Sequence, residues 1–155
     1  MQRLLFPRVI DNTFRGQWLG FWLLAPVLLL KLAIAVASII RPDRANAADA
    51  IDLSSFSPAA LREAMTSTAL LGLLHLCIAL MGVLAMVRYR AMVVLIYLWL
   101  LAEFLGRRVV FALHPVDRVE GPSTGAGVNT ALLAMMVLGL ALSLWPRHHA
   151  PGAQS

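Results

Sequence analysis

Charged residues and cysteine are both scarce in this chain of 155 residues. Only 14% of the residues are charged and 60% are hydrophobic, whereas a soluble domain is about 25% charged and about 45–50% apolar. A chain of this length buries only about 70% of its surface, so a soluble core cannot hide the apolar excess. The composition therefore excludes an ordinary soluble domain and predicts an integral membrane protein whose apolar surface faces the lipid bilayer.

The single cysteine, Cys77, lies in the middle of an apolar run. One cysteine excludes an internal disulfide, and without a CxxC motif there is no basis for quinone-linked redox chemistry. We expect Cys77 to be a packed, inert thiol inside the membrane.

Signatures of a reaction are missing as well. There is no Ser/His/Asp arrangement, no pair of carboxylates within the apolar stretches and no phosphate-binding loop. His75 and His114 lie at different predicted depths, which disfavours a haem held by two histidines, and the adjacent His148 and His149 make a weak metal site. The sequence thus predicts no cofactor and no metal, and it favours a protein that is not an enzyme.

Basic residues outnumber acidic ones, with 13 Lys and Arg against eight Asp and Glu. They are spread along the chain and form no patch beside aromatic residues, so the sequence excludes nucleic acid as a partner. We interpret these residues as signals of membrane topology.

Four apolar stretches are long enough to cross a bilayer, which takes about 20 residues per helix. They are residues 18–40, 67–87, 91–113 and 128–145. The link around Arg88 and Arg90 is so short that the second and third stretches must run antiparallel. Ser57 and Pro58 form a helix start, so the second helix should begin well before the membrane. We predict an all-α, single-domain membrane protein over residues 1–155, an antiparallel up-down four-helix bundle.

The distribution of charge predicts the orientation of this bundle. Residues 1–17, the Arg88–Arg90 link and the flexible tail 146–155 carry six basic residues and one acid. The loops at 41–66 and 114–127 carry four basic and six acidic residues. The positive-inside rule then puts both termini in the cytoplasm and both loops in the periplasm of a bacterial inner membrane. Four aromatic residues suited to the cytoplasmic interface agree: Trp18, Trp22, Tyr89 and Trp145.

A signal peptide is the alternative interpretation of the first apolar stretch. Ala45-Asn46-Ala47 resembles a cleavage site. However, a run of 23 residues is long for a signal peptide, and Arg41 and Arg44 separate it from that site. We therefore predict an uncleaved first helix.

Four ionisable residues from three of the apolar stretches form a candidate polar cluster. They are Lys31, His75, Glu103 and Arg107. At 1.5 Å per residue their predicted depths agree within about 6 Å, in the outer half of the bilayer. We expect Glu103 to pair with Arg107 and Lys31, with His75 adjacent. Gly72, His75, Ala79 and Gly82 form a stripe of small residues that lets helices approach closely.

Two roles are open for the cluster. Such residues inside a membrane cost about 2.5–3.5 kcal/mol each at mid-depth, and they pair or mark a function. The pairing can fix helix register, or the cluster can bind a ligand, proton or substrate.

The segments RLLFPRVIDNTFRGQWLGFWLL and LLAEFLGRR resemble a group of small, uncharacterised bacterial inner-membrane proteins. The four-helix size is also similar to the DoxX-like family in architecture. The resemblance implies four helices and assigns no activity.

We therefore carry two hypotheses. The first is an accessory or interaction subunit of a membrane assembly, with another membrane protein or a second copy as its partner. The second is a binding or transport protein in which the polar cluster holds an anionic, lipid or quinone-like small molecule.

Overall fold

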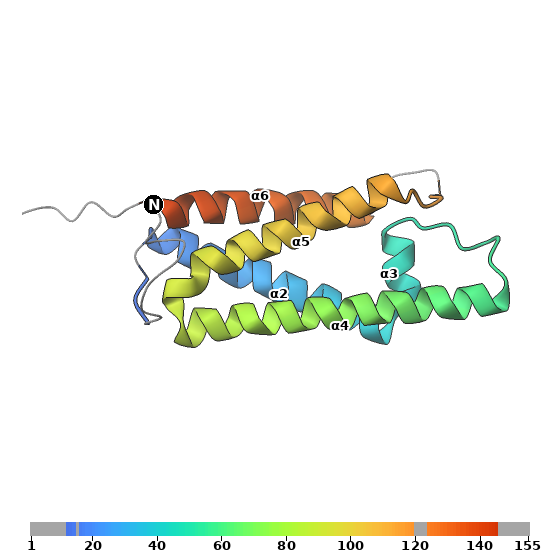
Figure 1. Ribbon diagram of the computed structural model, residues 1–155, viewed down its shortest axis with the longest axis horizontal. Coiled ribbons are helices and arrows are strands. Elements are labelled where there is room, and N and C mark those ends of the chain that lie inside the picture. The colour runs from blue at the N-terminus through green and yellow to red at the C-terminus, as the bar shows by residue number, and fades with distance from the viewer. Residues whose placement is uncertain (1–11, 15, 120–123, 146–155) are drawn as a thin grey trace, which may run out of the picture.

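The computed structural model describes residues 12–14, 16–119 and 124–145, and the regular elements in these ranges are helical (Figure 1). In chain order they are α2 (Trp18–Ile40), α3 (Pro42–Ala48), α4 (Pro58–Arg88), the 3₁₀ helix η1 (Arg90–Met92), α5 (Val93–Leu113) and α6 (Thr124–Leu144). The predicted all-α class is confirmed. The predicted flexible tail, with its two histidines, lies outside the described residues.

Three helices are long and apolar enough to cross a membrane, judged by length and composition: Trp18–Ile40, Pro58–Arg88 and Gly125–Leu144. Helix α5 has 21 residues, but Glu103, Arg107 and Arg108 lie within it. The first, second and fourth predicted spans are therefore found as helices of membrane-spanning character, and the third as helix α5.

The start of α4 follows directly from the local sequence. The Ser57 hydroxyl accepts a hydrogen bond from the Ala60 backbone N–H at 3.3 Å, and Pro58 occupies the first helical position. A serine cap satisfies one of the free N–H groups of the first turn, and proline has no N–H to leave unpaired there. The predicted extension of this helix beyond the apolar stretch is confirmed.

The start of α6 differs from the prediction. The helix begins at Thr124, four residues before the predicted span. Tertiary packing overrides the low helix propensity of this glycine-rich stretch. A Cβ at Gly125 would lie 2.5 Å from Asp49 Oδ1, so only glycine lets α6 come this close to the end of α3.

The segment predicted as the loop 41–66 contains the short helix α3. Its Asn46 is buried, accepts a hydrogen bond from Thr68 Oγ1 at 2.8 Å and thereby joins α3 to α4. The following residues pair with the segment after α5, through Asp52 N–H to Asp117 O and Val119 N–H to Ala50 O. The two predicted loops therefore hold each other at one end of the molecule.

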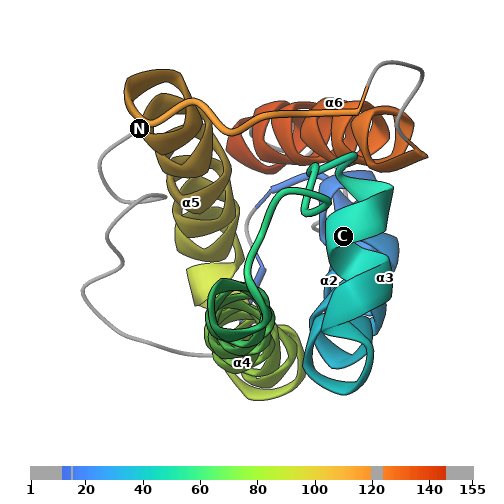
Figure 2. The same cartoon turned by 90° about the vertical axis from the view of Figure 1, so that its right-hand side faces the viewer.

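The four long helices lie side by side, and the chain direction alternates from each to the next (Figure 1). Viewed along the long axis, α2, α4, α5 and α6 surround a common centre (Figure 2). Helix α2 packs along α4 and α6, whereas α4 and α5 diverge from the link at Tyr89 and η1 (Figure 1). This divergence leaves α4 and α5 with few mutual contacts at the end that carries α3.

The apolar core centres on Tyr97 of α5, which is fully buried. Its hydroxyl donates a hydrogen bond to Gly20 O at 2.8 Å. A Cβ at Gly139 would lie 2.2 Å from the same hydroxyl oxygen, so this glycine of α6 makes room for the ring. Large apolar residues from three helices fill the space around it: Phe21, Leu24, Leu28, Leu100, Phe104, Leu132 and Met136.

Candidate functional site

The small-residue stripe of α4, which predicted a close approach between helices, packs against α2. Gly72, His75, Ala79 and Gly82 are all buried. A Cβ at Gly72 would lie 2.8 Å from the Cβ of Ser38, and one at Gly82 would lie 2.5 Å from a methyl group of Leu28. At Gly72 the two helices therefore approach too closely for a larger residue, and at Gly82 a larger residue would displace the Leu28 side chain. This close contact between α2 and α4 positions Lys31 and His75 so that both side chains reach Glu103.

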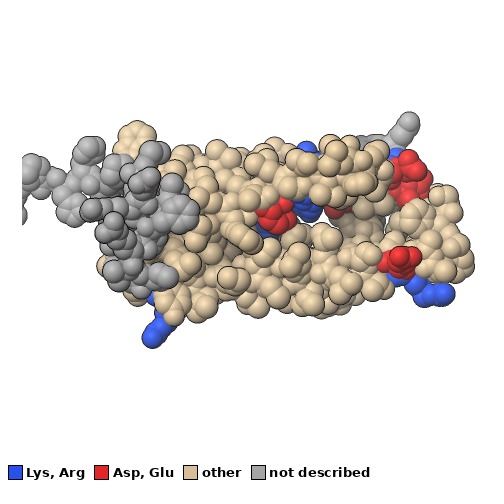
Figure 3. Space-filling view, in the orientation of Figure 1, with Lys and Arg blue, Asp and Glu red and all other residues tan. Residues whose placement is uncertain are grey.

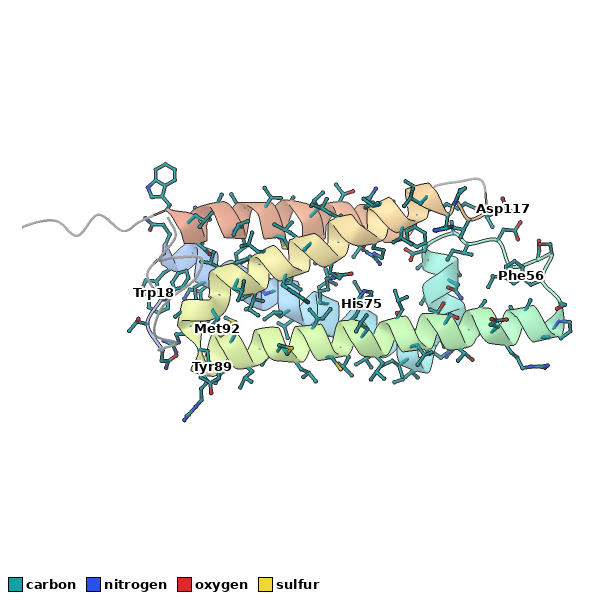
Figure 4. The ribbon with its side chains drawn as sticks, in the orientation of Figure 1. Trp18, Phe56, His75, Tyr89, Met92 and Asp117 are labelled. Atoms are coloured by element: carbon teal, nitrogen blue, oxygen red, sulfur yellow. The ribbon has the colours of Figure 1, made fainter. Side chains whose placement is uncertain are left out.

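Three ionisable side chains meet between α2, α4 and α5. Lys31 Nζ donates to Glu103 Oε2, and His75 Nε2 lies 2.9 Å from Glu103 Oε1. Because an ionised carboxylate only accepts, Nε2 of His75 carries the hydrogen of this bond. Figure 4 shows His75 on the side of α4 that faces α5 and α2. We call Lys31, His75 and Glu103 the ionic triad.

The ionic triad satisfies its own polar groups. The side chains of Lys31 and His75 are 6% and 9% exposed, and that of Glu103 is 14% exposed. A buried charge without a partner is costly, whereas here each carboxylate oxygen receives a donor. The arrangement links three helices at one point. The expected contacts of Glu103 with Lys31 and His75 are confirmed.

The expected pair between Glu103 and Arg107 is wrong. Arg107 NH2 donates to Asn129 Oδ1 of α6 at 3.2 Å, and no ion pair between Arg107 and Glu103 occurs in the described structure. Both oxygens of Glu103 are taken by donors from α2 and α4. One turn further along α5, the longer arginine side chain reaches across to α6 instead.

Arg107 belongs to a second polar feature at the end of the molecule that carries α3. It lines a pocket of about 260 Å³ together with Arg108, Phe111 and Ala112 of α5, Ala126 and Asn129 of α6, Asp49 and Arg118. We call this the arginine pocket. Asp49, Arg118 and Asn129 were not candidates in the sequence, because they are distant in the chain and only the packing of α3 and α6 gathers them.

Charged side chains are scarce on the face shown in Figure 3. There they are visible in a hollow between α5 and α4, at the end near α3 and at the opposite lower corner (Figure 3). Exposed leucines, among them Leu70, Leu74 and Leu84, lie along α4.

The other residues considered from the sequence lie elsewhere. Cys77 is exposed, which corrects the expected packed position, because it is turned away from the buried stripe of His75 and Ala79. His114 follows the last residue of α5. In the part of the chain that the structure describes, no group of three His, Cys, Asp or Glu residues could hold a metal ion.

Comparison of the chain with protein-family models, with curated proteins and with solved structures finds no match. The resemblance to small inner-membrane proteins therefore stays a prediction.

Proposed function

We propose that the protein is a four-span integral membrane protein in which α5 crosses the bilayer beside α2, α4 and α6. Two observations support the inclusion of α5. Its charged residues Glu103 and Arg107 bond to neighbouring helices, which lowers the cost of placing them in a membrane. Its exposed positions include Leu105, Val109 and Val110, which suit contact with lipid.

The proposed orientation puts both termini on the cytoplasmic side of a bacterial inner membrane. The end with the α4–α5 link carries Arg88 and Arg90, and acidic residues gather at the other end: Asp43, Asp49, Asp52 and Asp117. Figure 4 places Trp18 and Tyr89 at the first end and Asp117 at the second. Basic residues favour the cytoplasmic side, and exposed Trp and Tyr favour the interface.

Within this arrangement we propose an accessory or interaction role in a membrane assembly. The observation that carries it is the exposed face of α5 at Ala102 and Gly106. Most described glycines lie against a neighbouring element, but a Cβ at Gly106 would meet nothing within 4 Å. Glycine costs about 1 kcal/mol in a helix, and the fold of this chain does not require it here. Small residues one turn apart are typical of close helix–helix contact in membranes.

The test is native mass spectrometry of gently solubilised membranes. The wild-type protein should appear in a complex with another polypeptide or with a second copy of this chain. Gly106→Leu should lose that complex, because the leucine blocks close approach. Ala33→Leu is the matched control, a small-to-large change at an exposed position of α2. A complex that survives Gly106→Leu, or a wild-type protein that is always a bare monomer, would contradict the proposal.

A second candidate function is a small-molecule site at the ionic triad. It is favoured by the partial exposure of Glu103 and by the hollow in which charged side chains are visible (Figure 3). A bound small-molecule mass on the wild-type protein should then disappear in the double variant Lys31→Met, Glu103→Gln. Because this variant removes both charges, it leaves no unpaired ion to unfold the protein. Equal ligand mass on both proteins would refute this function.

A further inference from the structure

The arginine pocket gathers three guanidinium groups from two parts of the chain. Arg107 and Arg108 project from adjacent positions of α5, and Arg118 comes from the segment that follows it. Asp49 is the one acidic residue among the described lining residues. The described lining therefore carries an excess of two positive charges around about 260 Å³ of space.

The three arginines have no acidic partner in the described ranges 12–14, 16–119 and 124–145. Instead, Arg108 lies over the ring of Phe104 at 5.4 Å, and Arg118 lies over the ring of Phe111 at 5.8 Å. Stacking on a ring face holds a guanidinium in place and leaves its edge donors free. One guanidinium nitrogen of Arg107 donates a hydrogen bond to Asn129, and its other N–H groups have no acidic partner among the described residues.

Asp49 does not neutralise the pocket. Its Oδ1 lies 2.5 Å from the position that a Cβ on Gly125 would take, at the first turn of α6, and among the described residues no arginine forms an ion pair with it. The first turn of a helix exposes unpaired N–H groups and favours negative charge. The carboxylate lies beside the helix start and forms no ion pair with the described arginines, so their guanidinium groups are available to another anion.

We propose that the arginine pocket binds a phosphate group, carried by a phospholipid headgroup or by a soluble phosphate compound. Fixed guanidinium forks match the oxygens of phosphate in charge and in geometry. The carboxamide of Asn129 adds a neutral hydrogen-bonding group to the same wall.

The position of the pocket makes a lipid headgroup a natural source of the phosphate. Arg107 and Arg108 lie six and five residues before Leu113, the last residue of α5, which is about 9 Å and about 7.5 Å along the helix. In the proposed four-span arrangement this is the outer boundary of the bilayer, where long basic side chains reach the headgroups. This choice of source depends on the proposed membrane placement, whereas the phosphate chemistry depends on the pocket alone.

The experiment measures binding of phosphatidylglycerol to the purified full-length protein in a nonionic detergent by native mass spectrometry. The double variant Arg107→Gln, Arg118→Gln should bind this lipid at least tenfold more weakly than the wild-type protein, because it loses two charge-assisted contacts. The control Arg62→Gln, Arg88→Gln removes two exposed arginines outside the pocket and should bind like the wild type. Arg118→Gln alone leaves the contact of Arg107 with α6 intact and should still weaken binding.

A parallel measurement with inorganic phosphate and glycerol phosphate distinguishes the two sources. Thermal stabilisation of the wild type, absent from Arg118→Gln, assigns a soluble phosphate compound, whereas binding of phosphatidylglycerol alone assigns the headgroup. Equal binding by wild type and pocket variants, or no binding of any of these probes, would overturn the proposal. Gly106→Leu should leave phosphate binding unchanged, so failure of the subunit hypothesis is separable from failure of this one.

Discussion

The two ends of the helix assembly are held together in different ways. Near the α4–α5 link, Tyr97 fills the space between α2 and α6; Gly139 makes room for its ring, and Gly20 lets α2 approach Ser143 of α6. Towards α3, α4 and α5 separate, and the contacts between helices become ionic or polar. Shape complementarity closes the first end, and paired charges bridge the second. Both candidate sites lie towards this second end, where α4 and α5 diverge (Figure 1).

The largest test of this comparison removes the acidic member of the ionic triad. Glu103→Leu leaves Lys31 buried without a counter-charge, so we expect a loss of about 3–5 kcal/mol in the free energy of unfolding. Chemical denaturation in detergent measures it. Adding Lys31→Met to the same protein should recover most of the loss, because no charge is then left unpaired. A double variant as unstable as the single one would show that the ionic triad does not act as a pair.

One added methyl group should destabilise the packing around Tyr97 at the apolar end. Gly139→Ala puts a Cβ against the Tyr97 hydroxyl, which is tied to Gly20 and cannot move freely. We expect a loss of about 1–3 kcal/mol from overpacking, visible as a lower thermal midpoint. Gly127→Ala is the control on the same helix, since nothing lies within 4 Å of its added Cβ. If both variants behave alike, the fit around Tyr97 is not what closes this end.

The hydrogen bond between Arg107 of α5 and Asn129 of α6 should contribute less to stability than the ionic triad or the packing around Tyr97. Asn129→Ala removes the acceptor for Arg107, and we expect a loss of about 1 kcal/mol in the free energy of unfolding. Thr130→Ala is the neighbouring control, because in the described part of the chain its hydroxyl bonds to Ala126 O of its own helix and to no other helix. If the Asn129 variant is as stable as the Thr130 variant, the bond from Arg107 to Asn129 does not stabilise the fold, and only the ionic triad does so among these polar contacts.

The smallest expected change in the free energy of unfolding is a gain in stability. Gly106→Ala fills open space on the exposed face of α5, so it should stabilise the isolated protein by about 0.5–1 kcal/mol through helix propensity. The same change should weaken a complex that uses this face. Thermal melting and native mass spectrometry of one preparation measure the two effects together. A destabilised monomer would show that Gly106 serves the protein's own fold.

Much of the helical pattern could be predicted from local sequence. The bounds 18–40 are recovered as α2, and the Ser57–Pro58 start of α4 is recovered with its cap. Apolar length and capping chemistry are local properties, so they are legible without a structure. The glycine-rich start of α6 was not predicted, because its helix depends on contact with α3.

The candidate site was predictable in part. Lys31, His75 and Glu103 could be grouped from their depths along three helices, because helical rise converts residue number into distance. The depth of a residue along its helix does not determine the direction in which its side chain points. The partner of Arg107 was therefore assigned wrongly, and Asn129 and Arg118 were missed.

By itself, the sequence determined that this chain is helical and apolar enough for a membrane, because composition and the lengths of apolar runs depend on no distant contact. Tertiary structure alone decided which charges pair and which stay available. The divergence of α4 from α5 and the approach of α6 to α3 place Glu103 between Lys31 and His75 and leave three arginines around one pocket. Pairing depends on positions of a few ångströms across different helices, and only the packed assembly sets those positions.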